Sequence, residues 1–141
     1  MVNVEHLRMI QGVINRMAQV SFILKGWTVT IVMVMFGFAA NTSTPWLGLL
    51  TLFPSLLFGG LDAYYLKQER LFRCLYEKVR LDPDGEIIPP FSMKTQPCEG
   101  EVGSWWITLL RPTIIWFYGT IVLLTIIIYI LLCVNTGNGG K

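Results

Sequence analysis

The sequence predicts an all-α membrane protein with three transmembrane helices, and two observations carry this prediction. Residues 113–133 form an unbroken, uncharged apolar run, about as long as the roughly 20 residues that a helix needs to cross a bilayer. Of all residues, 53% are hydrophobic and 14% are charged, against roughly 25% charged in soluble domains. Because the chain has 141 residues, we expect a single membrane domain.

The chain is expected to begin with an amphipathic helix over residues 4–24. This helix should run directly into a first span over residues 20–40, because Lys25 can extend its charge to the lipid headgroups while its stem stays in apolar surroundings. No cleavable signal peptide is expected, since no short apolar core ends in a small-residue cleavage site. The apolar residues at helical spacing that predict the amphipathic helix are Leu7, Ile10, Ile14 and Met17.

A second span is expected over residues 44–64, joined to the first by a short uncharged turn. Pro54 predicts a kink in this span, because proline removes one helix hydrogen bond and clashes with the preceding turn. Apolar residues continue at helical spacing beyond the span, so the helix should extend out of the membrane over residues 62–80. The two amphipathic segments can bury their apolar stripes against each other or against copies from other subunits.

The segment over residues 81–103 is expected to be a loop, because prolines and glycines break every periodicity in it. A short interfacial helix should follow over residues 104–110. Arg111 and Pro112 then mark the entry into the last span, over residues 113–133.

Lys and Arg are distributed unevenly around the predicted spans. They precede the first span and lie between the second and the third, whereas the hairpin turn carries none and the tail carries only Lys141. Basic residues concentrate on the cytoplasmic side of membrane proteins. We therefore expect the N-terminus and the central segment to be cytoplasmic and the C-terminus to lie on the opposite side of the membrane.

Small and hydroxyl-bearing residues recur at helical spacing in the first two spans. Such stripes let helix backbones approach closely and form hydrogen bonds across helices. Helix packing is the favoured interpretation, and a pore lined by small and hydroxyl groups is the alternative. The residues concerned are Thr30, Gly37, Gly48, Thr51, Ser55 and Gly59.

Asp62 is the acidic residue nearest to a span, and it lies close to Lys25 in predicted depth. Ionisable groups at membrane depth are functional candidates, but here a structural interfacial ion pair is favoured over an ion or proton site. Beyond Asp62, basic residues outnumber acidic ones on the cytoplasmic helix. Such an imbalance attracts phosphates. Contact with anionic lipid headgroups is slightly favoured, and a site for a nucleotide, nucleic-acid or protein signal is the alternative. These basic residues are Lys67, Arg70, Arg73 and Arg80.

Catalytic chemistry finds little support in the sequence. His6 is the only histidine, which excludes multi-histidine metal sites. Cys74, Cys98 and Cys133 are expected on a helix, in the loop and at a membrane end, without zinc or redox spacing. The acidic run at residues 82–86 lacks the distal glutamate of a calcium loop, so a solvated turn is favoured. We expect no enzyme, no metal and no cofactor.

Two stretches carry a recognisable signature, EHLRMIQGVINRMAQVSFILKGW at residues 5–27 and LDAYYLKQERLFRCLYEKVR at residues 61–80. They resemble a widespread family of small bacterial multi-span membrane proteins with an MIQ-VI-RMA-SF-LKGW start and an LDAYYL-QERLFR-LY motif. The resemblance implies a bacterial inner-membrane protein, whose C-terminus would accordingly be periplasmic, but it implies no reaction and no catalytic residues. Proteins of this type also resemble membrane effectors of antiphage defence, such as the signal-gated channel of the Hailong system. This second likeness implies an oligomer that opens a pore or disrupts the membrane.

Three functions are compatible with the sequence. The first is an oligomeric channel or membrane-disrupting effector gated through the cytoplasmic helices, and it needs several subunits because three spans do not readily enclose an aqueous path. The second is a membrane anchor or adaptor that recruits a soluble partner. The third, a small transporter, is disfavoured because neither internal repeats nor a charged site at mid-membrane is visible.

Overall fold

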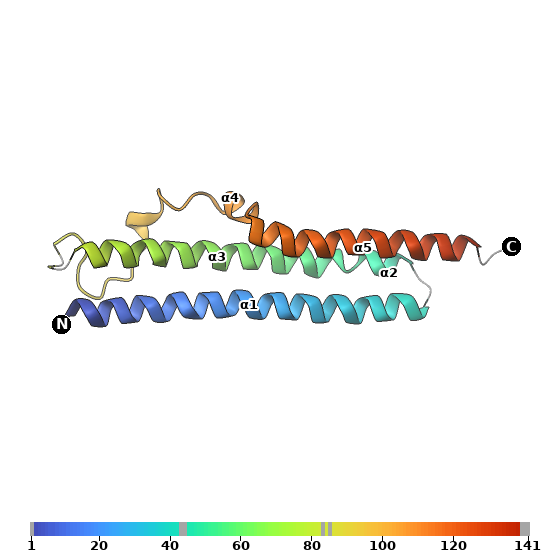
Figure 1. Ribbon diagram of the computed structural model, residues 1–141, viewed down its shortest axis with the longest axis horizontal. Coiled ribbons are helices and arrows are strands. Elements are labelled where there is room, and N and C mark those ends of the chain that lie inside the picture. The colour runs from blue at the N-terminus through green and yellow to red at the C-terminus, as the bar shows by residue number, and fades with distance from the viewer. Residues whose placement is uncertain (1, 43–44, 83, 85, 139–141) are drawn as a thin grey trace. The chain divides into compact units, whose positions relative to one another are not determined.

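The computed structural model describes residues 2–42, 45–82, 84 and 86–138. Within these ranges every regular element is a helix (Figure 1). The described chain divides into two compact units: unit 1 comprises Met1–Phe22 with Ala63–Thr108, and unit 2 comprises Ile23–Asp62 with Leu109–Lys141. Three helical stretches are long and apolar enough to cross a membrane, namely Val4–Thr42, Trp46–Leu81 and Pro112–Val134.

Helix α1, Val2–Thr42, is a single helix that contributes residues to both units. The amphipathic segment and the first apolar segment thus form one element. The sequence explains this continuity, because no proline interrupts the helix between its ends.

The second apolar segment is interrupted, which corrects the prediction of one kinked helix. Helix α2, Pro45–Leu49, ends before helix α3, Leu52–Leu81, begins. Pro54 has no N–H for the carbonyl of Leu50, and its ring clashes with that carbonyl. The Leu50 carbonyl instead accepts a hydrogen bond from the Phe53 N–H at 3.2 Å. The proline therefore acts one turn before its own position.

Unit 1 has an apolar core between the first part of α1, the second part of α3 and the chain that follows α3. After α3 the chain turns back along that helix (Figure 1). Two short helices lie in this returning chain, η1 over Gln96–Cys98 and α4 over Trp105–Leu109; α4 falls within the short helix expected there. The buried core residues are Ile10, Ile14, Leu71, Leu75, Val79, Ile88, Cys98 and Val102.

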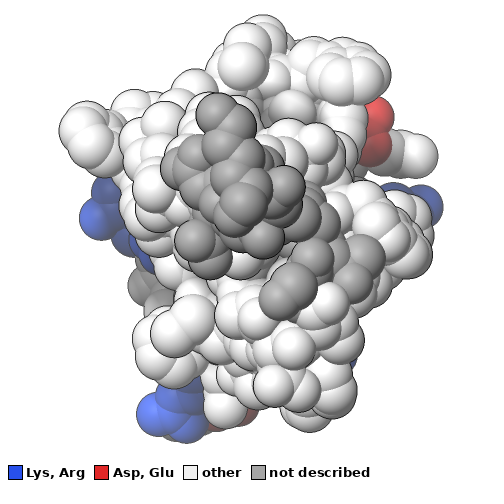
Figure 2. Space-filling model, turned by 90° about the vertical axis from the view of Figure 1, so that its right-hand side faces the viewer, with Lys and Arg blue, Asp and Glu red and all other residues white. Residues whose placement is uncertain are grey.

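Unit 2 consists of the second part of α1, α2, the first part of α3, and helix α5, Pro112–Asn138. Helix α2 packs against α5. Residues 26–61 and 112–138 carry no Lys, Arg, Asp or Glu. In the view of Figure 2 the described residues are mostly white, and Lys, Arg, Asp and Glu atoms are seen only toward the edges. Such a surface suits the hydrocarbon region of a bilayer.

Candidate functional site

An ion pair joins α1 to α3 within unit 2. Lys25 Nζ donates a hydrogen bond to Asp62 Oδ2 at 2.5 Å, and the exposed fractions of the two side chains are 22% and 1%. A carboxylate buried to this degree requires a partner, because an unpaired charge in an apolar interior is costly. The sequence placed these two residues at the same depth, and the structure brings them into contact.

Helix α5 contributes Tyr118 to the surroundings of this ion pair. The Tyr118 hydroxyl donates to the Phe58 carbonyl at 3.3 Å, and it also lies near enough to Thr28 and Asp62 to interact with both. Thr28 is fully buried and donates to the carbonyl of its own helix one turn earlier. We call Lys25, Thr28, Asp62 and Tyr118 the polar cluster.

Sequence reasoning missed Thr28 and Tyr118, although a signal for Tyr118 exists. On α5, four buried residues recur at intervals of four, three and four, which is the spacing of one helix face. Two of them are polar, and the long apolar run hides this face because most of the neighbouring positions are apolar too. The four residues are Ile114, Tyr118, Ile121 and Thr125.

The polar cluster holds helices together and has no apparent chemistry of its own. Its cation and its anion compensate each other. Among the residues that the structure describes, no group of three or more His, Cys, Asp or Glu side chains could hold a metal ion. The arrangement thus fits a structural connection between the three long helices of unit 2.

The small residues predicted on the second span are buried inside unit 2. Thr51 Oγ1 lies 3.2 Å from Thr125 Oγ1 of α5, and Ser55 donates to the Thr51 carbonyl at 2.9 Å. A Cβ atom built on Gly59 would lie 3.4 Å from the ring of Tyr118. Gly48 is buried as well. Thr51, Ser55 and Gly59 are therefore in contact within one chain, whereas a Cβ atom built on Gly48 would meet no atom within 4 Å.

The small residues predicted on the first span are open instead. Thr30 and Gly37 are exposed, and a Cβ atom built on Gly26 or Gly37 would meet no atom within 4 Å. A groove of about 310 Å³, lined by Ile23, Gly26, Trp27 and Thr30, lies on this part of α1. We call the face formed by Gly26, Thr30 and Gly37 the α1 small-residue face.

The basic residues predicted to bind a ligand lie along α3 in unit 1. Arg73 is bonded to Glu69 at 2.8 Å, and Arg80 to Glu77 at 2.7 Å. Lys67 and Arg70 are half-buried. Acidic neighbours on the same helix thus compensate the two arginines, which reduces the excess charge on which the predicted attraction of phosphates depends.

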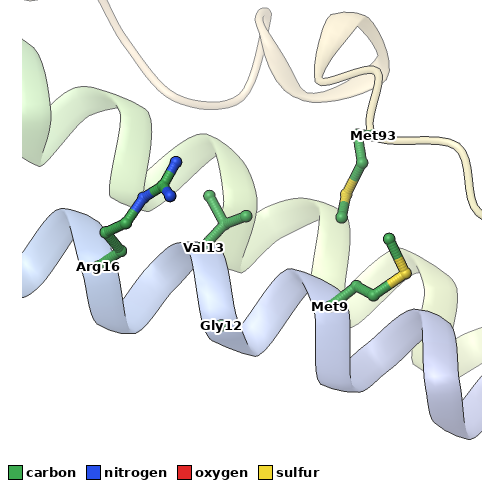
Figure 3. A pocket seen from close by; sticks show the side chains of 5 residues that line it. All are labelled: Met9, Gly12, Val13, Arg16 and Met93. Atoms are coloured by element: carbon green, nitrogen blue, oxygen red, sulfur yellow. The ribbon is translucent and has the colours of Figure 1, made fainter.

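A second groove, of about 240 Å³, opens on unit 1. It is lined by Met9, Gly12, Val13 and Arg16 of α1 together with Met93. Met93 lies in the segment between α3 and α4, which we call the loop of unit 1. Figure 3 shows the side chains of Met9 and Met93 approaching each other from the helix and the loop, with Arg16 farther along the helix. We call this the methionine groove.

Several contacts fasten the loop of unit 1. His6 Nε2 lies 2.9 Å from the Ser92 carbonyl oxygen, and Lys78 Nζ donates to the Pro97 carbonyl at 2.7 Å. The carboxylate of Asp82 accepts hydrogen bonds from three consecutive backbone N–H groups, those of residues 86–88. This capping turns the chain back after α3, so the acidic run acts through Asp82 as a turn.

A disulfide also joins the loop to α3, and it corrects the interpretation of the cysteines. Cys74 and Cys98 are predicted on a helix and in a loop without redox spacing, but they are bonded to each other, with their Cα atoms 6.1 Å apart. Cys133 is free and exposed. A sequence separation of 24 residues gives no local signal, because the pairing depends on the path of the returning loop.

No protein-family model, curated protein or solved structure matches this chain. The conclusion from its own residues is a helical protein with three helices suited to cross a membrane, that is, a possible multi-span membrane protein.

Proposed function

We propose that the chain is one subunit of a homo-oligomeric channel in the bacterial inner membrane, gated through unit 1. The observation that supports it best is the contrast between the two small-residue stripes. Thr51, Ser55 and Gly59 on α3 and just before it make contacts inside the chain, whereas Thr30 and Gly37 of the α1 small-residue face are exposed and a Cβ atom built on Gly26 or Gly37 would meet no atom within 4 Å. Small residues at four-residue intervals let transmembrane helices pack closely. A second copy of the chain is the partner that this face suits.

A pore then forms around α1. Thr30 is exposed on this helix, and its hydroxyl donates to the Gly26 carbonyl at 3.0 Å. With α1 helices around a central axis, Gly26 and Gly37 form the contact between neighbouring helices, the Thr30 hydroxyl at the edge of this contact lines the path, and the strongly apolar α5 faces lipid. This is the pore of small and hydroxyl groups considered above, formed by α1 alone.

Gating through unit 1 follows from the path of the chain. Helices α1 and α3 each contribute residues to both units. A signal that changes the packing of α1 on α3 in unit 1 therefore acts on the two helices that carry Lys25 and Asp62. Because the chain resembles signal-gated antiphage effectors, we propose that the signal arises during phage infection.

The first prediction concerns the interface. Gly37→Leu is expected to shift the purified protein toward smaller species, because the new side chain separates helices that pack through the α1 small-residue face. Native mass spectrometry of the protein in detergent measures the distribution. Gly119→Leu is the matched control, since Gly119 is exposed on α5 and its Cβ would meet Ile115 only at 3.9 Å. If the distribution of oligomers is unchanged in Gly37→Leu, the subunit interface does not lie on this face of α1.

The adaptor function has one specific observation in its favour, the methionine groove. Methionine side chains adapt to different partners, and Met9 is 47% exposed. This groove suits a soluble protein partner. The partner would insert an apolar side chain between the methionines and place an acidic group against Arg16. The two functions differ in one respect, since an adaptor carries no current.

A further inference from the structure

We propose that Cys74 and Cys98 are a reversible thiol–disulfide pair, oxidised by hydrogen peroxide, that fixes the loop of unit 1 onto α3. The proposal rests on the cytoplasmic placement of unit 1 in the proposed function. Thiols are kept reduced in the cytoplasm, and disulfides that form there are mostly transient and redox-sensing. A bonded pair in a segment rich in Lys and Arg therefore indicates a sensor.

The pair lies where its oxidation state affects the loop. Cys98 belongs to the buried core of unit 1, together with Ile88 and Val102 of the same returning chain. Cys74 lies on α3 and packs against that core. The bond thus joins the loop of unit 1 to α3.

The two sulfurs have different environments, and this difference assigns their roles. Cys98 is fully buried, whereas Cys74 is half-buried. Glu101 Oε2 lies 3.3 Å from Cys74 Sγ, so in the dithiol form this carboxylate accepts the thiol hydrogen. Because oxidation depends on access to the sulfur, the more exposed Cys74 meets the oxidant first and Cys98 resolves the product.

The oxidation balances without any further reactant. The Cys74 sulfur gives up its proton and attacks one oxygen of hydrogen peroxide; the O–O bond breaks, and water leaves with that proton, so that Cys74 becomes a sulfenic acid. The Cys98 sulfur then attacks the Cys74 sulfur. The S–O bond breaks, and the departing hydroxide takes the Cys98 proton as a second water. A cytoplasmic dithiol returns two electrons and two protons by exchange.

The loop keeps other attachments when the bond is reduced. His6 holds the Ser92 carbonyl, Lys78 holds the Pro97 carbonyl, and Asp82 caps the turn. The dithiol form therefore keeps its fold but has a looser loop. Met93 forms one wall of the methionine groove and belongs to this loop, so oxidation fixes that wall in place.

The test counts free thiols in cells that express the full chain with Cys133→Ser. Cells are quenched with acid before and after hydrogen peroxide treatment, and the protein is alkylated with a maleimide polymer that retards it on gels. The expected result is modification of both thiols before treatment, loss of modification after it, and recovery once peroxide is removed. A pair bonded in untreated cells, or a pair still fully modified after peroxide, would overturn the proposal.

Two variants test the order of the steps. In Cys98→Ala, peroxide should produce a sulfenic acid at Cys74 that a dimedone probe labels, whereas in Cys74→Ser the probe should leave Cys98 unlabelled. The reverse labelling would contradict the assigned roles. In the purified protein with both cysteines, trypsin should cleave after the exposed Lys94 faster in the dithiol form; equal rates would show that the bond does not hold the loop.

Failure of this inference and failure of the proposed function give different results. Reporters that are active only in the periplasm, fused after Arg80 and after Lys141, place unit 1 independently, and only the second should be active. A permanent bond together with an active reporter after Arg80 would overturn the predicted orientation as well. A cytoplasmic pair that never oxidises, in a protein that still conducts ions, would refute the sensor and leave the channel standing.

Discussion

Replacing Asp62 with asparagine is expected to lower the free energy of unfolding by about 3–5 kcal/mol, the usual cost of removing one partner from a buried ion pair. Asparagine keeps the shape of the side chain but removes its charge. Lys25 then loses its counter-ion, although only 22% of its side chain is exposed. Thermal or denaturant unfolding in detergent, followed by tryptophan fluorescence, measures the change.

The matched control removes both charges. Lys25→Met combined with Asp62→Leu should recover most of the lost stability, because apolar residues of similar size often replace a buried ion pair without loss. The coupling between the two sites is read from the double-mutant cycle. An Asp62→Asn protein as stable as the parent would show that the pair does not hold α1 to α3.

The second large effect is expected from Gly59→Leu. A Cβ at this position would already lie 3.4 Å from Cδ1 and Cγ of Tyr118, so the remaining leucine carbons collide with the ring. Overpacking of this kind costs about 1–3 kcal/mol, and here it also displaces the Tyr118 hydroxyl from the Phe58 carbonyl. We expect a lower unfolding temperature and reduced expression.

Gly119→Leu is the control for this variant too, since its Cβ would meet only Ile115, at 3.9 Å. It should leave the unfolding temperature close to that of the parent. The two glycine variants are expected to differ in what they lose. Gly59→Leu should lower the unfolding temperature, and Gly37→Leu should reduce the fraction of oligomers. A stable Gly59→Leu protein would mean that α3 and α5 do not pack as described.

The helices of this protein were predictable because their signals are local. Long apolar runs and helical spacing of Ile10, Ile14, Leu75 and Val79 depend only on neighbouring residues. The break before α3 was harder to place. A proline disturbs the carbonyl four residues earlier, so the irregular backbone appears at Leu50 and Thr51 rather than at Pro54.

The candidate site was predictable in part. Lys25 and Asp62 were paired because they are the charged residues nearest to the ends of two neighbouring spans. Tyr118 was missed because hydropathy alone does not show which face of an apolar helix turns inward. The bond between Cys74 and Cys98 was missed for a different reason. It depends on the three-dimensional path of the loop, and no local sequence pattern indicates that path.

The proposed channel is tested most directly by recording current across a planar bilayer that contains the purified protein. The account predicts discrete current steps from the parent protein and from Gly119→Leu, and their loss in Gly37→Leu, whose α1 small-residue face no longer packs. The bilayer protein is cross-linked after recording to show that oligomers are present. An oligomeric parent protein that passes no current, with the pair Cys74 and Cys98 either reduced or bonded, would contradict the channel and favour the adaptor.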